Sequence, residues 1–236
     1  MSKKPARKKT GKNAGGSAGD RNVKRVAKLD TATISDALDK LRIPGQCLGI
    51  KPRDHAFRLA GRAYTILYGP LDAEKPGTVG EFIDKLGPGD VVVIDNGGRE
   101  DATVWGDILT FLAHKKKLAG TVIDGACRDV HLCLSLGYPI YSRSYSMRTG
   151  KDRVQVDAEQ VPINIGDARV QPGDLIRGDA DGVICIPKSR EDEVLDVAEQ
   201  IDAAEAKIRA LLEKGKTITE ARALMKYHSL QTPDKQ

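Results

Sequence analysis

The feature that most constrains the fold is the stretch from Asp95 to Asp129, which predicts a strand, a loop, a helix, a second strand and a turn. The run 91–94 is apolar and β-branched, so it predicts a buried strand that stops at a polar, glycine-containing loop. Gly106 and Asp107 then open a helix whose apolar residues recur near helical spacing. Residues 121–123 predict the next strand, and residues 124–129 predict the turn that leaves it.

A strand, a helix and another strand in this order predict a parallel crossover, with the carboxyl ends of both strands at one edge. The free amides of a helix that starts near Gly106 would then lie close to Arg128 and Asp129. Amides and a guanidinium favour a carboxylate or phosphate, and an aspartate can hold a hard divalent cation. The pattern therefore predicts an anion site beside a metal site. In the competing interpretation, Arg128 and Asp129 pair with other side chains and only fix a turn.

Charge is concentrated at the amino terminus. The chain has 236 residues, of which 40% are hydrophobic, and a formal net charge of +5. The first twenty residues contain six cationic side chains and Asp20, so 6 − 1 = +5 lies in this segment and the remainder is close to neutral. The excess charge belongs to a tail and not to a binding face, so nucleic acid is not an expected partner.

The composition predicts one domain behind this tail. We expect a disordered basic tail at 1–21, one domain at 22–228 and a frayed end at 229–236. The sequence contains no run of about eighteen apolar residues, so no membrane-spanning segment is expected. The four cysteines are scattered without a CxxC pair, which disfavours zinc or a disulfide framework and predicts reduced thiols in a cytoplasmic protein.

The remaining segments predict an α/β domain that ends in a long helix. Strands are expected at 59–67, from 138 onward, at 154–157, 161–165, 170–176 and 179–187, the last two joined by a tight Asp/Gly turn. Helices are expected at 31–41, 79–86, 130–136, 189–214 and 219–227.

Five segments, taken together and in order, resemble the RraA-like family. That family includes the divalent-metal-dependent 4-hydroxy-4-methyl-2-oxoglutarate and 4-carboxy-4-hydroxy-2-oxoadipate aldolases. The similarity covers nearly everything after Asn22. The matching segments read TATISDALDKL, RLAGRAYTI, GDILTFLAHKKKLAGTVIDGACRDV, PGDLIRGDADGVICIP and EAKIRALLEKGKT.

The resemblance implies a fold, an assembly and a substrate class. It implies a layered α/β sandwich with a C-terminal helix, assembled as a homotrimer or a hexamer with active sites between subunits. It also implies a small 2-oxo acid substrate. Arg128 would bind the carboxylate and carbonyl of this substrate, and Asp107 would lie near the catalytic water. Further substrate contacts would come from the helix start and the preceding loop, at Asn96, Gly97, Gly98, Gly106, Ile108 and Leu109.

The resemblance also implies a metal site, with one departure from the family pattern. Asp129 would ligate Mg²⁺ or Mn²⁺, and a helix carboxylate of the adjacent subunit, Glu205 or next Glu199, would contribute through metal-bound water. The family's aldolases carry another acidic residue three positions after this aspartate, where the chain has Leu132. A leucine side chain cannot bind a metal or its water. The neighbouring His131 either replaces the missing acid or is a helix surface residue.

Three functions remain compatible with this sequence. The first is a metal-dependent lyase that cleaves 4-hydroxy-2-oxo diacids or decarboxylates oxaloacetate, releasing pyruvate. The second is a non-catalytic regulator that, like RraA, binds and inhibits ribonuclease E. The third keeps the pocket for other chemistry on a hydroxy or oxo acid. Gly106, Asp107, Arg128 and Asp129 favour catalysis, and Leu132 favours regulation or altered chemistry.

Overall fold

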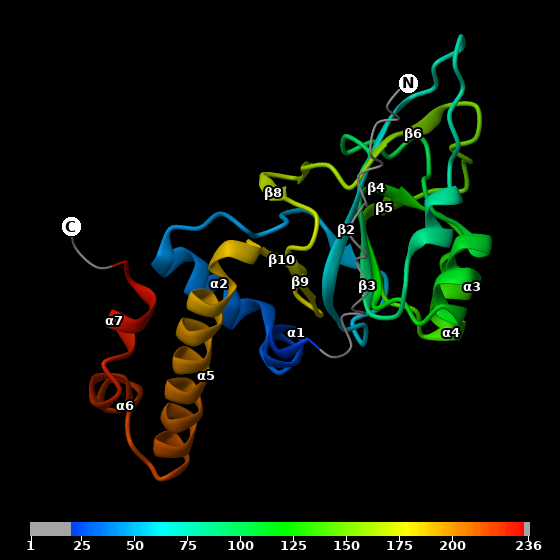
Figure 1. The fold of residues 1–236 in the computed structure, drawn as a ribbon. Coiled ribbons are helices and arrows are strands. Elements are labelled where there is room, and N and C mark those ends of the chain that lie inside the picture. Colours follow the sequence, from blue (N-terminus) through cyan, green and yellow to red (C-terminus); the bar gives the residue numbers. More distant parts are fainter. Residues whose placement is uncertain (1–19, 234–236) are drawn as a thin grey trace, which may run out of the picture.

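The computed structural model describes residues 20–233, and a mixed eight-stranded sheet is its main element (Figure 1). The main path runs β1-β5-β4-β3-β2-β9-β10, and β6 pairs with β2. Strands β2 to β5 are parallel, whereas β1, β6, β9 and β10 join antiparallel. The bounds are β1 (Lys51–Pro52), β2 (Leu59–Pro70), β3 (Asp90–Asp95), β4 (Gly120–Cys127), β5 (Ile140–Tyr145), β6 (Val154–Glu159), β9 (Leu175–Gly178) and β10 (Val183–Ile186). Strands β7 (Ile163–Ile165) and β8 (Ala168–Val170) form a separate hairpin.

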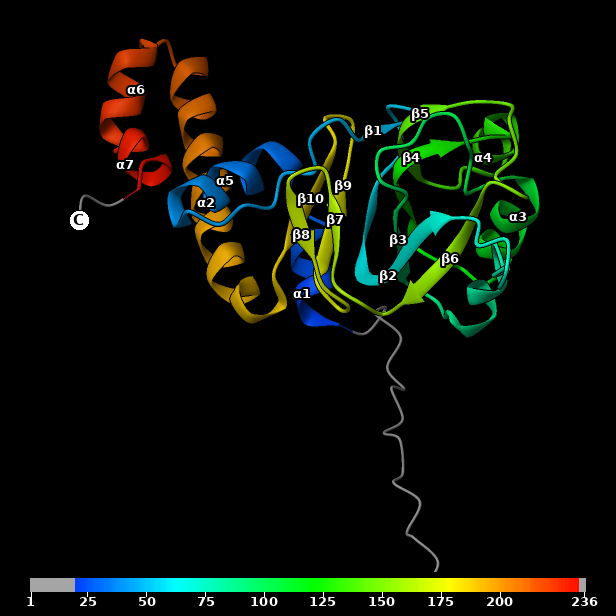
Figure 2. The ribbon, with the colours of Figure 1, turned by 90° about the horizontal axis from the view of Figure 1, so that it is seen from above.

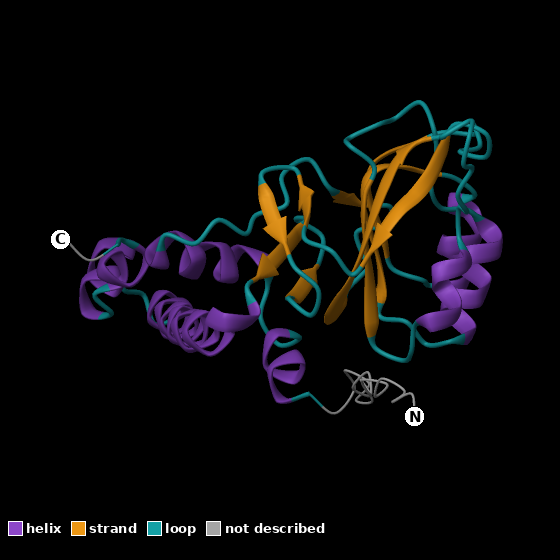
Figure 3. Ribbon diagram, turned by 45° about the horizontal axis from the view of Figure 1, so that its top comes forward, coloured by secondary structure: helices purple, strands orange, loops and turns teal. Residues whose placement is uncertain are grey.

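Helices lie at both ends of this strand layer, so the expected α/β sandwich is confirmed (Figures 2 and 3). At one end, α3 (Asp107–Lys115) and α4 (Val130–Leu136) pack against each other beside the parallel strands. The other end holds α1 (Arg21–Val26), α2 (Thr31–Leu41), α5 (Glu191–Glu213), α6 (Ile218–Leu224) and α7 (Tyr227–Gln231). Two short 3-10 turns, η2 (Glu81–Lys85) and η3 (Lys188–Arg190), complete the described elements. None of the helices in the described range is long and apolar enough to cross a membrane.

The hydrophobic residues form two clusters, one for each layer of helices. The larger cluster joins β2, β3, β4 and β5 to the segment before α3, and its largest fully buried side chains are Trp105, Tyr138 and Tyr141. The smaller one packs α1, α2 and α5 on β9 and β10. In α5, residues such as Val194 and Ile201 are fully buried, as the apolar stripe in the sequence predicts. Burying each such side chain contributes about 1.5–3 kcal/mol.

The central unit forms as the sequence predicts. Residues 91–94 lie in β3 and are at most 1% exposed. Helix α3 begins at Asp107, and α4 ends before Gly137, whose φ of 63° suits a glycine C-cap. In the parallel register Asp95 lies opposite Asp124, so the exits of β3 and β4 are neighbours. Strand β4 continues to Cys127 and delivers the chain directly to Arg128 and Asp129.

The ends of the structured region differ slightly from the predicted domain boundaries. Asp20 caps α1 by accepting hydrogen bonds from the Asn22 and Val23 amides, and its carboxylate also binds Arg62 at 2.7 Å. Asp20 and Arg21 are therefore structured, although the sequence places them in the tail. At the other end α7 extends through Gln231, past the expected boundary at 228. The rest of the predicted basic tail lies outside the described residues.

Three secondary-structure predictions also need correction. Residues 124–127, expected in a turn, belong to β4, because Asp124 is satisfied inside the fold by Arg143 and the Gly166 amide. The expected strand at 170–176 divides into β8 and β9, since Asp174 accepts the Gln171 amide at 2.8 Å and turns the chain between them. The helix expected at 219–227 is two helices, separated where Lys226 adopts a φ of 49°.

Candidate functional site

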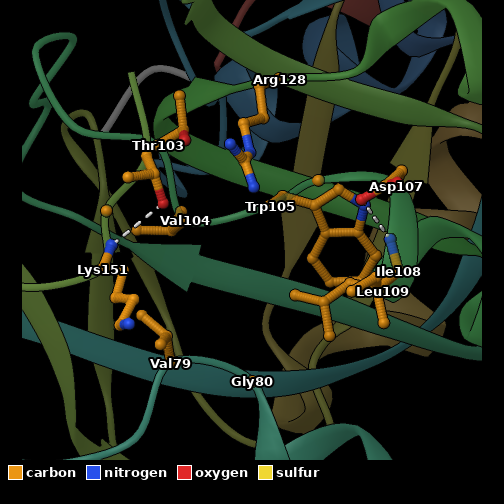
Figure 4. A pocket seen from close by; sticks show the side chains of 13 residues that line it. Val79, Gly80, Thr103, Val104, Trp105, Asp107, Ile108, Leu109, Arg128 and Lys151 are labelled. Atoms are coloured by element: carbon orange, nitrogen blue, oxygen red, sulfur yellow. Dashed lines mark hydrogen bonds between the residues drawn. The ribbon is translucent and has the colours of Figure 1, made fainter. Parts of the chain in front are cut away.

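A cavity of about 320 Å³ opens where α3 begins, beside the segment that leaves β4 (Figure 4). Its walls come from four separate parts of the chain. The lining residues are Val79, Gly80, Thr103, Val104, Trp105, Gly106, Asp107, Ile108, Leu109, Arg128, Thr149, Gly150 and Lys151. The cavity therefore contains Gly106, Asp107, Ile108, Leu109 and Arg128, which the sequence places at a binding site.

The start of α3 is capped by a residue from another element. The N-cap Gly106 has no side chain to offer, and the Asp129 carboxylate takes its place by accepting the Asp107 amide through Oδ2 at 3.0 Å. A Cβ on Gly106 would lie 2.9 Å from Asp129 Oδ2 and 3.1 Å from Arg128 Nε. Glycine is required here because any side chain would separate α3 from the Arg128-Asp129 turn.

The Arg128 side chain is directed into the cavity while its backbone is fixed (Figure 4). The Arg128 amide donates to Trp105 O at 2.9 Å, which ties the turn to the segment before α3. Arg128 Nε lies 3.5 Å from Asp129 Oδ2, and the side chain is 39% exposed. Its terminal Nη groups make no hydrogen bonds to other described residues. A planar guanidinium with two free donors suits a carboxylate.

The amides of the first α3 turn are only partly free. The Asp107 amide binds Asp129, and the Ile108 amide donates to Asp107 Oδ1 at 2.8 Å. Leu109 N has no hydrogen-bond partner among residues 20–233. An anion that used both predicted amides, Ile108 and Leu109, would have to displace the Asp107 carboxylate from Ile108.

Asp129 is the residue best placed to hold a cation. It has a φ of 55° and its side chain is 30% exposed. Oδ2 is taken by Asp107 N, whereas Oδ1 accepts no hydrogen bond from the described residues. Within this range no group of three or more His, Cys, Asp or Glu side chains could hold a metal ion. Mg²⁺ is usually bound by one or two carboxylates together with waters and substrate oxygens. Asp129 suits a site of this kind, and not one in which protein side chains supply every ligand.

Trp105 forms the rigid floor of the cavity. Its indole Nε1 donates to Thr110 Oγ1 at 2.9 Å, and Thr110 Oγ1 donates to Gly106 O at the same distance. The indole also stacks on Tyr138 with ring centroids 6.2 Å apart. These contacts fix the segment that leads into α3.

The nearby cysteines do not supply a nucleophile. All four cysteines of the described chain are free and buried. Burial raises the pKa of the Cys127 thiol and of the Cys133 thiol, which lie on either side of the Arg128-Asp129 turn. Both thiols are therefore protonated near neutral pH, and thiolate chemistry is disfavoured.

Asn96, Gly97 and Gly98 do not line the cavity. Asn96 is 2% exposed, and its side-chain amide donates to Ala102 O at 3.1 Å. The Gly98 amide donates to Asp124 O, and the Gly97 amide to Asp95. The loop thus stabilises the exits of β3 and β4, and its predicted pocket contact is not present within one chain.

Glu205 and Glu199 lie on α5, at the opposite end of the molecule from α3 (Figure 2). Glu205 accepts from Tyr227 Oη and lies 3.5 Å from Arg209, and Glu199 binds Arg25 at 2.7 Å. Neither carboxylate reaches the cavity of its own chain, so the expected metal role requires a neighbouring subunit.

The departure from the family pattern lies in the first turn of α4. The Leu132 amide donates to Asp129 O at 3.0 Å, and its side chain is half-buried. His131 is exposed and does not line the cavity. The structure thus places His131 on the helix surface, as the second interpretation of this residue expects.

Several lining residues carry no signal in the sequence. Thr103, Trp105, Thr149 and Lys151 come from loops without a recognisable motif. Thr103 forms bridges to both Ala126 and Thr149, and its amide and hydroxyl both donate to Arg148 O, so these contacts bring the loop after β5 to the cavity. The proximity depends on tertiary pairing, which leaves no periodic signal in the sequence.

Comparison with known proteins matches residues 31–185 to the RraA-like family, described as Aldolase/RraA. The chain belongs to this family. It is 36% identical over 184 residues to a Halalkalibacterium halodurans protein provisionally named 4-hydroxy-4-methyl-2-oxoglutarate aldolase, covering 78% of this chain and 85% of the relative. It is also 40% identical over 204 residues to Protein DlpA of Legionella pneumophila, covering 85% of this chain. The matched part spans only 33% of DlpA.

Solved structures support the same fold. An uncharacterised protein from Pseudomonas syringae pv. tomato has a TM-score of 0.79 and 37% identity, covering 85% of this chain and 96% of that one. Streptomyces coelicolor RraAS2, described as an unusual member of the RNase ES inhibitor RraA family, has a TM-score of 0.75 and 26% identity. That match covers 80% of this chain and 96% of RraAS2. The RraA-like fold therefore includes relatives named as enzymes and relatives named as inhibitors.

Proposed function

We propose that the protein is a divalent-metal-dependent carbon–carbon lyase that acts on 2-oxo acids. The reaction would be retro-aldol cleavage of a 4-hydroxy-2-oxo diacid or decarboxylation of oxaloacetate, with pyruvate as a product. One observation carries this proposal: the Arg128 guanidinium, the start of α3 and the Asp129 carboxylate meet at one cavity. Relatives with aldolase names support the same reaction class.

Each group at the cavity has a separate role in the proposed reaction. Arg128 binds the carboxylate next to the 2-oxo group and orients it at two points. The Leu109 amide faces the same end of α3 and adds a neutral donor. Asp107, the first residue of α3, is exposed and holds or moves a proton near the reacting bond. The apolar wall of Val104, Trp105 and Leu109 limits water around the substrate.

The donor set at Asp129 fits Mg²⁺ or Mn²⁺, because carboxylate oxygen is the ligand that these hard cations prefer. Oδ1 of Asp129 is the open ligand atom, while Oδ2 remains with the α3 amide. When bound, the cation supplies Lewis acidity that stabilises negative charge on the substrate oxygen as the carbon–carbon bond breaks.

The proposed assembly is a homotrimer or a hexamer. Ile108 at the cavity and Phe111 one turn later are 77% and 59% exposed, which is unusual for large apolar side chains beside a binding site. A neighbouring subunit that covered them would also bring its own α5 carboxylates, Glu205 or Glu199, within reach of Asp129. We also place the protein in the cytoplasm, since all four cysteines in the described range are free thiols.

The direct test is a steady-state assay of purified protein with Mg²⁺ or Mn²⁺. Oxaloacetate and branched 4-hydroxy-2-oxo diacids are the substrates, and coupled pyruvate release is the signal. We expect turnover with at least one substrate, loss of turnover on chelation and recovery when the cation is returned. No pyruvate release from any of these acids with either cation would contradict the lyase proposal.

Leu132 favours a second candidate, a non-catalytic regulator of ribonuclease E. The chain has a leucine where the family's aldolases carry a carboxylate in the first turn of α4, and RraAS2, described as an unusual member of an RNase ES inhibitor family, has a similar fold. A binding assay with purified ribonuclease E decides this candidate. Inhibition of RNA cleavage without any oxo-acid turnover would favour it. Turnover of a different hydroxy or oxo acid would instead favour the third function, in which the cavity serves altered chemistry.

A further inference from the structure

The cavity is lined by more cationic than anionic side chains. Arg128 and Lys151 are cationic, and Asp107 is the one carboxylate among the lining residues. Lys151 Nζ makes no hydrogen bond or ion pair with any residue in the range 20–233. In Figure 4 Lys151 and Asp107 stand on opposite sides of the cavity, with Arg128 between them. Lys151 is therefore a second cation at the cavity of Arg128, and its ammonium has no partner among the described residues.

The backbone of Lys151 is fixed at the cavity wall. The Lys151 amide donates to Thr149 Oγ1 at 3.2 Å, and the Arg153 guanidinium donates to Lys151 O at 3.3 Å. The preceding Gly150 packs so closely that a Cβ there would lie 2.2 Å from Thr103 O. The loop is thus held against Thr103 at the cavity wall, and the Lys151 side chain extends from a fixed backbone.

The two cations suit two different anionic groups. The Arg128 fork is planar and is filled by one carboxylate bound at two points. The Lys151 ammonium is a point charge on a flexible stem, so it binds an acidic group over a range of positions. Val79, Val104 and Leu109 provide apolar surface at this cavity, which suits a carbon chain. A molecule with one carboxylate would leave Lys151 without a partner.

We propose that Lys151 is a specificity-determining residue that selects 2-oxo acids with a second carboxylate at the far end. This inference rests on the proposed function, in which Arg128 binds the carboxylate beside the 2-oxo group. Lys151 binds the distal carboxylate, takes no part in bond cleavage and discriminates diacids from monoacids of the same length.

A matched pair of ligands tests this role by calorimetry with Mg²⁺ present. 2-Oxoglutarate carries a distal carboxylate, and 2-oxopentanoate has the same carbon chain with a methyl group at that end. We expect the wild-type protein to prefer 2-oxoglutarate by about tenfold, the effect of one added hydrogen bond between charged groups. Lys151→Met should remove this preference by weakening 2-oxoglutarate alone, and Lys151→Arg should largely restore it.

Two controls separate recognition from folding and from net charge. Lys207→Met removes an exposed cation on α5, far from the cavity, and should leave both affinities unchanged. Equal melting temperatures of wild type and Lys151→Met would show that the loop remains intact. If Lys151→Met weakens both ligands alike, or leaves the preference unchanged, Lys151 has no selective role although Arg128 still binds. If neither ligand binds the wild-type protein, the proposed function fails and this inference fails with it.

Discussion

Asp129 links two helices, because its backbone leads into α4 and its side chain caps α3. It precedes α4 in a left-handed conformation, with φ 55°, which costs about 1 kcal/mol for a residue other than glycine, although Asp and Asn tolerate it best. Its Oδ2 caps α3 through the Asp107 amide. This cap offsets the backbone strain, and it leaves Oδ1 without a hydrogen-bond partner among the described residues.

Two substitutions at Asp129 separate its capping role from its proposed metal role. Asp129→Asn keeps an oxygen for the Asp107 amide and tolerates the same backbone, so it should melt close to wild type while losing Mg²⁺ or Mn²⁺ affinity. Asp129→Ala loses both functions and should cost about 1 kcal/mol, or 2–4 °C in melting temperature. Calorimetric cation titration and thermal unfolding measure the two effects. Unchanged cation affinity in Asp129→Asn would remove this residue from the metal site.

Leu132 offers a test of whether one missing carboxylate limits activity. Its backbone already follows Asp129 in the first turn of α4, where a glutamate would extend the hydration shell of a cation at Asp129. Leu132→Glu should raise oxaloacetate decarboxylation about tenfold, which requires only about 1.4 kcal/mol of transition-state stabilisation. The control Leu132→Gln adds similar bulk without charge. A variant slower than an active wild type would assign Leu132 to a different substrate specificity.

At the scale of elements, a buried aspartate connects α2 to the β9-β10 hairpin. Asp179 is 4% exposed and accepts from the Thr31 amide at 2.8 Å and the Thr31 hydroxyl at 2.6 Å. Burial acts to raise the pKa of the Asp179 carboxyl, but hydrogen bonds from Thr31 and the Asp181 amide outweigh it, and the pKa is lowered. The ionised carboxylate therefore stabilises the helical layer on the sheet.

Removing this carboxylate should loosen the helical layer. Asp179→Ala leaves the buried Thr31 hydroxyl unpaired and should cost about 2 kcal/mol near neutral pH, or roughly 4–8 °C in melting temperature. Since the folded pKa is lowered, the stabilisation is present above the unfolded pKa of about 4 and is lost as pH falls through the folded value. Unfolding of wild type and variant should converge in acid. Asp181→Ala replaces an exposed neighbour and should change neither the free energy of unfolding nor the melting temperature. If wild type and Asp179→Ala differed in stability by the same amount at every pH, the ionic contribution would be refuted.

The elements that follow local patterns were predictable, whereas those that depend on distant partners were not. The bounds of α2 and α4 follow from apolar spacing and capping residues. Residues 124–127 have the sequence pattern of a turn but continue β4. The sequence does not reveal that Arg143 pairs with the Asp124 carboxylate. For the same reason, the cavity was only partly predictable from the sequence. Arg128 follows a recognisable motif, but Lys151 reaches the site only through loop pairing far along the chain.

At the scale of the whole molecule, the proposed site and its expected helix carboxylates lie at opposite ends. The cavity is beside α3, and Glu205 is on α5, beyond the strand layer (Figure 2). One chain cannot bring them together without unfolding the smaller core. Only a second copy could supply an α5 carboxylate to Asp129, so assembly and metal binding are linked in the proposed mechanism.

An exposed phenylalanine makes this link testable. Phe111 on α3 is 59% exposed, so replacing it scarcely changes the core of one chain, but a buried aspartate in an interface costs several kcal/mol. We expect the wild type to form a trimer or hexamer of 25.5 kDa chains and Phe111→Asp to be a folded monomer with weaker cation affinity. The control Leu224→Asp replaces another large apolar residue, which is 57% exposed on α6, and should leave the assembly intact.

Sedimentation equilibrium and cation titration of the same samples distinguish the outcomes. A monomeric Phe111→Asp with wild-type cation affinity would show that Asp129 needs no neighbour, and Glu205 would lose its proposed role. A wild type that remains monomeric at micromolar concentration would contradict the assembly itself, and the exposed Ile108 and Phe111 would then need another partner. Joint loss of assembly and affinity is the expected result, because residues 20–233 place no group of three or more His, Cys, Asp or Glu side chains where it could enclose a cation without substrate or a second copy.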